Sequence, residues 1–338
     1  MPQFMHILNN ALPDPAELQQ GRAMEPTPAA VPILRPNVLR AGYSDNEIRR
    51  LRRNGTWTTV RRGSYLSTGE ITPLDRVQRH ELLIRSTIPG LRLPAVVSHA
   101  SAAVLLGIPL WSTHLGLVHI TRPRPANGGK SGSLLCHTAT LPDDAIVEVS
   151  GIRITSPART IADLARQLPF EQAVVAADGA IFRKLMTAQQ LDAAVAAISG
   201  APGGRSAIRV ARFASGLSES VGESRSRVMM YRASLPDPEL QVKVHDANGT
   251  PLGRSDYGWL RGRLLGEFDG KIKYGRLLKP GESAGDVVFK EKLREDALRD
   301  NGSRVVRWVW AELAQPNEVI QRIRRAYAAV QRDIERGR

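Results

Sequence analysis

The chain has 338 residues, which is too long for one ordinary hydrophobic core and predicts two or three domains. Hydrophobic residues make up 42% and charged residues 24%, a composition that is typical of a folded globular protein and excludes wholesale disorder. Lys and Arg number 47 against 33 Asp and Glu, which leaves a net charge of +14. A field of this sign attracts polyanions, so nucleic acid is the leading class of partner, with an acidic protein or an anionic lipid as alternatives.

Signals for export or membrane insertion are not found in the sequence. The N-terminus lacks a cationic start followed by an apolar core and a cleavage site, and no stretch approaches the roughly 20 apolar residues of a membrane helix. The single cysteine, Cys136, cannot form an intramolecular disulfide, which favours a reducing compartment. We therefore expect a soluble cytoplasmic protein that makes no membrane contact.

Residues 1–34 are rich in Pro and Ala and are interpreted as an arm or linker. The next segment, residues 35–72, has regular turn signals. Ser44 and Glu47 have the spacing of a capping box, and Asn54–Gly55 is a typical helix stop. Two short helices and two short strands are expected at 36–41, 44–53, 57–61 and 64–66. This order predicts a winged helix-turn-helix, which is a DNA-binding domain.

Arginines are concentrated in this segment. Eight arginines lie between Arg35 and Leu66 against two acidic residues, a local excess of six positive charges. At about 100° per residue, Arg49, Arg52 and Arg53 share one face of the second helix. An arginine face suits a major groove, and the hairpin tip can touch phosphate or the minor groove. The expected DNA-binding residues are Arg49, Arg50, Arg52, Arg53, Arg61 and Arg62. A solvated charged face is the alternative.

Residues 73–205 are predicted to form a mixed α/β middle domain. Helices are expected at 97–107, 157–167, 170–184 and 187–198, with a strand at 117–121 and a hairpin at 146–154. The seven histidines and one cysteine show no zinc-binding spacing, so no zinc site is predicted. The Gly- and Pro-containing run 200–204 predicts the next domain boundary. A protein-docking surface is an alternative role for this domain.

Residues 206–338 have the predicted element order αβββαβα. The expected helices lie at 220–233, 285–301 and 317–336, and the expected strands at 239–246, 252–259, 262–269 and 304–310. With its carboxylates, this order resembles the PD-(D/E)XK nuclease fold, which implies a restriction-endonuclease-like domain. The predicted fold class of the whole chain is therefore α/β and α+β, multidomain.

Four carboxylates in this last domain are candidates for a metal-dependent phosphodiesterase site. Glu267 and Asp269 are two residues apart on a strand and point to one face, and Asp256 lies on the neighbouring strand. Converging acids can hold Mg²⁺, which polarises the phosphate and activates water. The candidate catalytic residues are Glu223, Asp256, Glu267, Asp269 and Lys271, with Asp256 and Glu267 as metal ligands.

The pattern departs from the nuclease motif at one key place. Asp269 stands two residues after Glu267, and the nearest lysine is Lys271. Mismatch-repair-like endonucleases also have Glu-x-Asp-Gly there, so the departure is compatible with catalysis. The alternative is a nuclease-like scaffold kept for binding or dimerisation, with its acids paired to Arg254 and to lysines.

Several longer segments are similar to AbiEi-type antitoxins of type IV toxin–antitoxin systems. The winged helix of that family resembles GYSDNEIRRLRRNGTWTTVRRGSYLS. Its middle part resembles VVSHASAAVLLGIPLW and TSPARTIADLAR. The endonuclease-like region of larger members resembles SESVGESRSRVMMYRASLPDPELQVKV, RSDYGWLRGRLLGEFDGKIKYG and EKLREDALRDNGSRVVRWVW.

The resemblance covers nearly the whole chain from about residue 35. It implies a non-enzymatic antitoxin that binds its own promoter, represses its operon and counteracts a nucleotidyltransferase toxin. The toxin need not be bound directly in a type IV system. The family's DNA contacts map to the arginines of 49–53 and 61–62. A Mg²⁺-dependent DNA endonuclease targeted by the winged helix is the alternative function.

Overall fold

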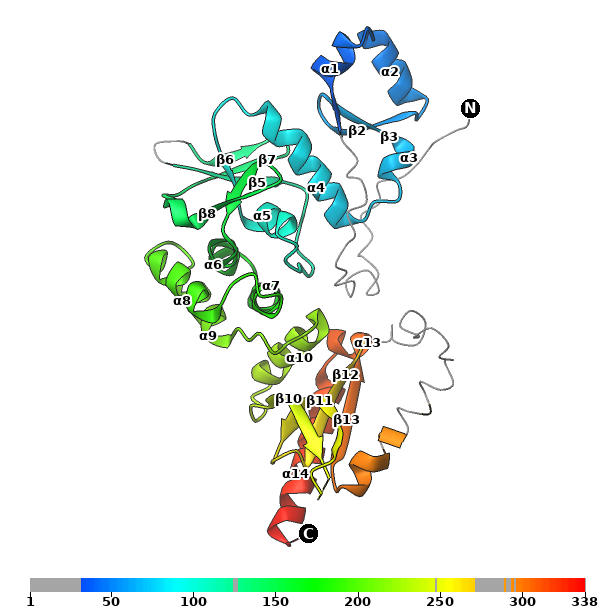
Figure 1. Cartoon of the computed structure of the whole chain (residues 1–338), viewed down its shortest axis with the longest axis vertical. Helices are drawn as coiled ribbons and strands as arrows, with labels where there is room; N and C mark the ends of the chain where they lie inside the picture. Colours follow the sequence, from blue (N-terminus) through cyan, green and yellow to red (C-terminus); the bar gives the residue numbers. More distant parts are fainter. Residues whose placement is uncertain are drawn as a thin grey trace. The chain divides into compact units, whose positions relative to one another are not determined.

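The computed structural model describes residues 32–123, 127–246, 248–270, 289, 293–294 and 296–337. These residues form a mixed α/β protein with three β-sheets (Figure 1). The described chain divides into two compact units, the first ending at Phe213 and the second beginning at Ala214, except that residues 181–183 belong to the second. No helix among the described residues is long and apolar enough to cross a membrane.

The first unit begins with a three-stranded sheet and two short helices. Its elements are β1 (Ile33–Leu34), α1 (Arg35–Arg40), α2 (Asp45–Arg53), β2 (Trp57–Arg61) and β3 (Ser64–Ser67), with strand order β1-β3-β2. The two helices and the hairpin predicted from the sequence are confirmed to within two residues at each end. The predicted boundary at residue 35 is corrected, because Ile33 and Leu34 pair with β3 and are part of this sheet.

The start of α2 is fixed by the predicted capping box. Ser44 Oγ accepts a hydrogen bond from Glu47 N at 3.3 Å, and the Glu47 carboxylate accepts one from Ser44 N at 2.8 Å. Ile48, on the opposite face from the arginines, is 3% exposed and packs with Val38 and Tyr65. This contact holds α2 against the hairpin and leaves its other face to solvent.

A six-stranded sheet forms the centre of the first unit. Its strands are β4 (Val96–Val97), β5 (Val118–Arg122), β6 (Gly129–Ser131), β7 (Leu134–Thr138), β8 (Ile146–Val149) and β9 (Ile152–Thr155), in the order β6-β7-β5-β4-β9-β8. β5 and β7 are parallel, as are β4 and β9. The hairpin predicted at 146–154 is confirmed as β8 and β9. The helix predicted from Val97 begins later, because Val97 pairs with Ile120 and Ile154 in the sheet.

Seven helices accompany this sheet in the described part of the first unit after β3. They are α3 (Thr68–Ile71), α4 (Arg76–Thr87), α5 (His99–Leu105), α6 (Pro157–Gln167), α7 (Phe170–Phe182), α8 (Ala188–Ala197) and α9 (Gly204–Phe213). α6 packs against α5, α8 and α9. The predicted division after Arg205 is therefore corrected: α9 belongs to the first unit, and the division falls after Phe213.

The second unit has a four-stranded sheet. Its described elements are α10 (Val221–Arg232), β10 (Glu239–His245), β11 (Pro251–Trp259), β12 (Leu264–Asp269), β13 (Arg304–Val309), α13 (Trp310–Ala314) and α14 (Asn317–Glu335). The strand order is β10-β11-β12-β13, with β12 and β13 parallel. The predicted strands and the two flanking helices are confirmed within two residues. The helix predicted at 285–301 lies partly outside the described residues, and 296–300 are helical.

The core of the second unit is aromatic. Tyr257 and Trp308 are each 1% exposed, and their rings are stacked with centroids 5.4 Å apart. Trp308 Nε1 donates to Ser226 Oγ at 2.8 Å, and the Tyr257 hydroxyl donates to the Glu223 carbonyl at 2.8 Å. The buried polar atoms of both rings are thus satisfied. These bonds fix α10 to the sheet and determine where Glu223 lies.

We expect Gly222→Ala to destabilise the second unit by about 1–3 kcal/mol, the usual cost of overpacking a core. An added Cβ at Gly222 would overlap the ring of Phe268, which is itself buried against Trp310. The change is measured by urea titration with hydrogen–deuterium exchange of α10 peptides. Gly200→Ala is the control, because a Cβ there has no atom within 4 Å. Equal midpoints for both variants would contradict the close contact.

Candidate nucleic-acid interface

The arginines of α2 form one exposed basic face. Arg49, Arg50, Arg52 and Arg53 are all exposed, whereas Ile48 is buried. None of the four makes a salt bridge within 4 Å to an acid in the described part of the chain. The helix therefore presents four guanidinium groups to solvent from a backbone that is anchored on the opposite side.

The two hairpin arginines have different surroundings. Arg62 is exposed at the turn, next to Gly63, whose φ of +79° suits a tight turn. Arg61 is half-buried, and its Nε donates to the Ser86 carbonyl at 2.7 Å. Arg61 thus anchors β2 to α4. The expected position of Arg61 at the exposed tip is corrected, and Arg62 alone is the exposed arginine of this hairpin turn.

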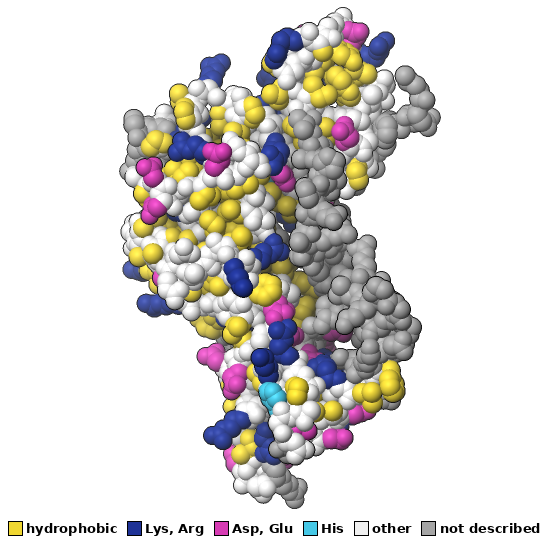
Figure 2. Space-filling model, viewed as in Figure 1, with side chains coloured by type: hydrophobic (Ala, Val, Ile, Leu, Met, Phe, Trp, Pro, Cys, Tyr) yellow, Lys and Arg dark blue, Asp and Glu magenta, His cyan; other side chains and the backbone are white. Residues whose placement is uncertain are grey.

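The acidic residues of this segment have local roles. Asp45 forms a bidentate salt bridge with Arg35, with a shortest N–O distance of 2.7 Å. The backbone hydrogen bond from Ser44 is the largest cause of the lowered pKa of Glu47, which keeps its capping carboxylate ionised. Figure 2 shows dark-blue side chains at the margins of the part that holds α1, α2 and the β2–β3 hairpin. Positive charge without an acidic partner in the described part of the chain lies on α2, on Arg62 and on Arg40, whose guanidinium donates to Asn37 Oδ1.

The carboxylate of Glu267, an expected metal ligand, forms salt bridges with arginines. Its Oε1 lies 2.8 Å from Arg294 Nη2, and its Oε2 accepts a hydrogen bond from Arg307 Nε at 2.8 Å. Glu267 is 9% exposed. A buried carboxylate between two guanidinium groups is an ion-pair network, and both of its oxygens are in use.

The other predicted acids are held by hydrogen bonds. Glu223 accepts bonds from Ser220 Oγ, from the Glu219 backbone N and from Gln241 Nε2, at 2.7–2.9 Å. Burial, and then the charge of Asp256, raise the pKa of Glu223 to about 7. Asp256 Oδ2 accepts a bond from Phe268 N at 2.8 Å. Asp269 is half-buried, and Lys271 lies outside the described residues.

This donor set does not fit a Mg²⁺ site. Across the described residues, no three of these carboxylates bring ligand oxygens within 4.8 Å of one another, which a shared ion would need. The strand positions agree with the prediction, since Tyr257 pairs with Gly266 and this register brings Asp256 beside Glu267. The sequence did not predict the salt bridges between Glu267 and its two arginines. Among the described residues, Glu267 is paired with Arg294 and Arg307, whereas Arg254, the expected partner of the acids, forms a salt bridge with Glu219.

A histidine cluster was missed by the analysis of spacing. In the part of the chain that the structure describes, His99, His119 and His137 are the one group of three metal-binding residues whose ligand atoms all lie within 4.8 Å. They come from α5, β5 and β7. Sequence spacing did not indicate this grouping, because the sheet brings together histidines that are far apart along the chain.

Comparison with known proteins gives distant relatives of the chain. No family model matches it. Two Mycobacterium tuberculosis proteins, uncharacterized protein MT2308 of strain CDC 1551 and uncharacterized protein Rv2248 of strain H37Rv, are each 36% identical over 147 residues. The match covers 44% of this chain and 53% of each relative, so the chain spans about half the length of the curated relatives it matches.

A solved structure also resembles the chain. The crystal structure of the Rv2827c protein from Mycobacterium tuberculosis has a TM-score of 0.38 and 18% sequence identity. The match covers 64% of this chain and 78% of that chain. A likeness at this level carries no argument about activity.

Proposed function

We propose that the chain is a DNA-binding antitoxin and transcriptional autorepressor of a type IV toxin–antitoxin operon. In this proposal α2 is the recognition helix of a winged helix-turn-helix, and the β2–β3 hairpin is its wing. Its DNA target is its own promoter, and its toxin is a nucleotidyltransferase. The identity of the toxin class comes from the sequence resemblance to AbiEi-type antitoxins.

The DNA-binding part of the proposal rests on the contrast between the two faces of α2. One face of the helix is buried through the packing of Ile48. The other face exposes four arginines that form no salt bridge with an acid in the described part of the chain. Arginine is the side chain best suited to bidentate contacts with guanine and phosphate. Arg62, exposed at the hairpin turn, adds a fifth positive charge from a second element.

The proposal is tested by binding of the full chain to its own upstream DNA over a salt series. Combined replacement of Arg49, Arg52 and Arg53 by Ala is expected to abolish preference over a scrambled duplex. If the three neutralise phosphates, the slope of log K against log salt falls by about 0.9 for each. Arg49→Ala alone is expected to cost about 1–3 kcal/mol if it reads a base.

The matched control is Arg153→Ala, which removes one exposed arginine of β9 in the same unit. It changes the net charge by the same amount as Arg49→Ala but lies on a different element. Equal losses for the two single variants would reduce the effect to net charge and sink the recognition-helix assignment. Arg62→Ala is expected to weaken binding to all sequences alike, since a phosphate contact carries no sequence information.

The endonuclease alternative is tested with the same protein. Incubation of excess full chain with supercoiled plasmid and Mg²⁺ or Mn²⁺ is expected to leave the plasmid intact, because Glu267 is held by two arginines. Metal-dependent nicking that is lost in both Asp256→Ala and Glu267→Ala would instead establish the enzyme and overturn the non-enzymatic proposal.

A further inference from the structure

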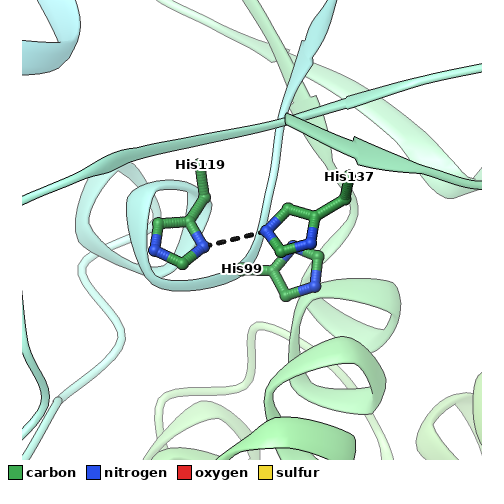
Figure 3. Close-up of side chains that lie close together, drawn as sticks. All are labelled: His99, His119 and His137. Carbon is green, nitrogen blue, oxygen red and sulfur yellow. Dashed lines mark hydrogen bonds between the residues drawn. The ribbon is translucent and has the colours of Figure 1, made fainter. Parts of the chain in front are cut away.

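Three histidines of the first unit face one another beside the central sheet (Figure 3). His119 Nδ1 lies 3.1 Å from His137 Nε2, and the rings of His99 and His137 are stacked with centroids 3.7 Å apart. Two nitrogens bound to one tetrahedral Zn²⁺ at 2.0–2.1 Å are roughly 3.3 Å apart. The spacing of the His119 and His137 nitrogens is therefore already close to that of ligands on one ion.

The backbone around the cluster is fixed by hydrogen bonds between α5 and β5. Ser98 N donates to the His119 carbonyl at 3.0 Å, and His119 N donates to Ser101 Oγ at 2.8 Å. The parallel pairing of β5 and β7 places His137 beside Thr121, two residues from His119. Three rigid elements thus supply one histidine each, and rigid elements hold a site more precisely than loops do.

Each imidazole can offer a metal ion the lone pair of the ring nitrogen that carries no proton. His99 also has a backbone φ of +52°, an uncommon conformation outside glycine. Such conformations cluster at functional sites.

The ring of His99 has a partner on its other side. Its Nδ1 lies 2.9 Å from Ser98 Oγ, which accepts a hydrogen bond from Thr121 Oγ1 at 2.8 Å. Ser98 and Thr121 are both buried. A proton on Nδ1 directed at Ser98 leaves the Nε2 lone pair for a ligand. Histidines that bind metals nearly always have such a second hydrogen bond, which fixes the tautomer and the orientation of the ring.

We propose that His99, His119 and His137 bind a divalent transition metal, with Zn²⁺ as the first candidate. Imidazole nitrogen suits Zn²⁺, Cu²⁺, Ni²⁺ and Fe²⁺, and three protein ligands leave one tetrahedral position open. The charge of the ion favours an anion or an ionised water in that open position. This site is independent of the proposed DNA interface.

The test uses the untagged full chain, stripped with a chelator and titrated with Zn²⁺ against a chromophoric competitor. One equivalent of Zn²⁺ per chain is expected, and Co²⁺ is expected to give the visible absorption of a tetrahedral site. His119→Gln and His137→Gln should each weaken Zn²⁺ binding by more than about 100-fold. Ser98→Ala should weaken it by about 10–100-fold, as the loss of an outer hydrogen-bond partner does.

The controls are His114→Gln and His245→Gln, which change exposed histidines outside the cluster. Both are expected to keep wild-type affinity. Zn²⁺ binding that survives in folded His119→Gln, or that is lost in a control variant, overturns the proposal. If the cluster variants do not fold, the wild-type protein decides the question: Co²⁺ must shift and broaden the ring NMR signals of His99, His119 and His137, and unchanged signals overturn the site.

Discussion

We expect Asp163→Ala to lower the free energy of unfolding of the first unit by about 3–5 kcal/mol, the usual effect of breaking a buried ion pair. Asp163 is 2% exposed, and its Oδ2 accepts a hydrogen bond from Arg159 Nε at 2.9 Å. Arg166 Nη1 lies 3.6 Å from the other carboxylate oxygen of Asp163. The arginine side chain of the closer pair is only 7% exposed. Removal of the carboxylate would therefore leave a buried guanidinium without its counter-ion.

The measurement is urea unfolding of the full chain, followed by hydrogen–deuterium exchange of α6 peptides. Asp144→Ala is the matched control, because it removes an exposed acid of the same unit and is expected to change stability by no more than about 0.5 kcal/mol. Similar midpoints for Asp163→Ala and Asp144→Ala would show that the pair has no structural role.

A double variant separates the charge effect from packing. Burial outweighs the two arginines in its effect on Asp163, so the pKa of this carboxyl is raised and its charge is costly in the fold. Replacement of both partners by apolar residues, Arg159→Met with Asp163→Leu, is therefore expected to recover most of the lost stability. A double variant as unstable as Asp163→Ala would assign the loss to shape and not to the unpaired charge.

The elements that local patterns define could be predicted well. The capping box of Ser44 and Glu47 and the turn at Gly63 each depend on residues within four positions of one another. The shared face of Arg49, Arg52 and Arg53 followed from the helical periodicity of α2 alone, and Ile48 is the buried residue on the opposite side. β4 and β7 were not predicted, although β2 and β3 are about as short, because the strand order that pairs each of them with β5 is not a local pattern.

The sites depend on partners far away in the sequence, and there the prediction failed. His119 and His137 are 18 residues apart and meet only because β5 and β7 pair in parallel. Arg61 was predicted to reach solvent, but its partner Ser86 is 25 residues further along the chain. No spacing rule links such residues. A sheet order, which the sequence did not predict for the middle region, was needed to find them.

The surroundings of Glu267 distinguish a catalytic from a structural role for the acidic cluster of the second unit. The carboxylate is buried between Arg294, 27 residues away, and Arg307, its neighbour on β13. A catalytic carboxylate that is arranged to bind a metal commonly lowers the stability of the fold. Its neutralisation therefore leaves the free energy of unfolding unchanged or raises it. A structural ion-pair centre has the opposite property, because its neutralisation leaves two arginines without their counter-charge.

We therefore expect Glu267→Gln to destabilise the second unit by about 1–3 kcal/mol, a range reduced from that of a fully buried pair because both arginines are partly exposed. The measurement is urea unfolding with hydrogen–deuterium exchange of β12 and β13 peptides. Asp300→Asn, an exposed acid before β13, is the control and should have little effect. A more stable Glu267→Gln variant that also loses metal-dependent nicking would assign the cluster to catalysis. Destabilisation without any nicking by the wild type would assign it to the scaffold, because only the ion-pair arrangement requires the charge for folding.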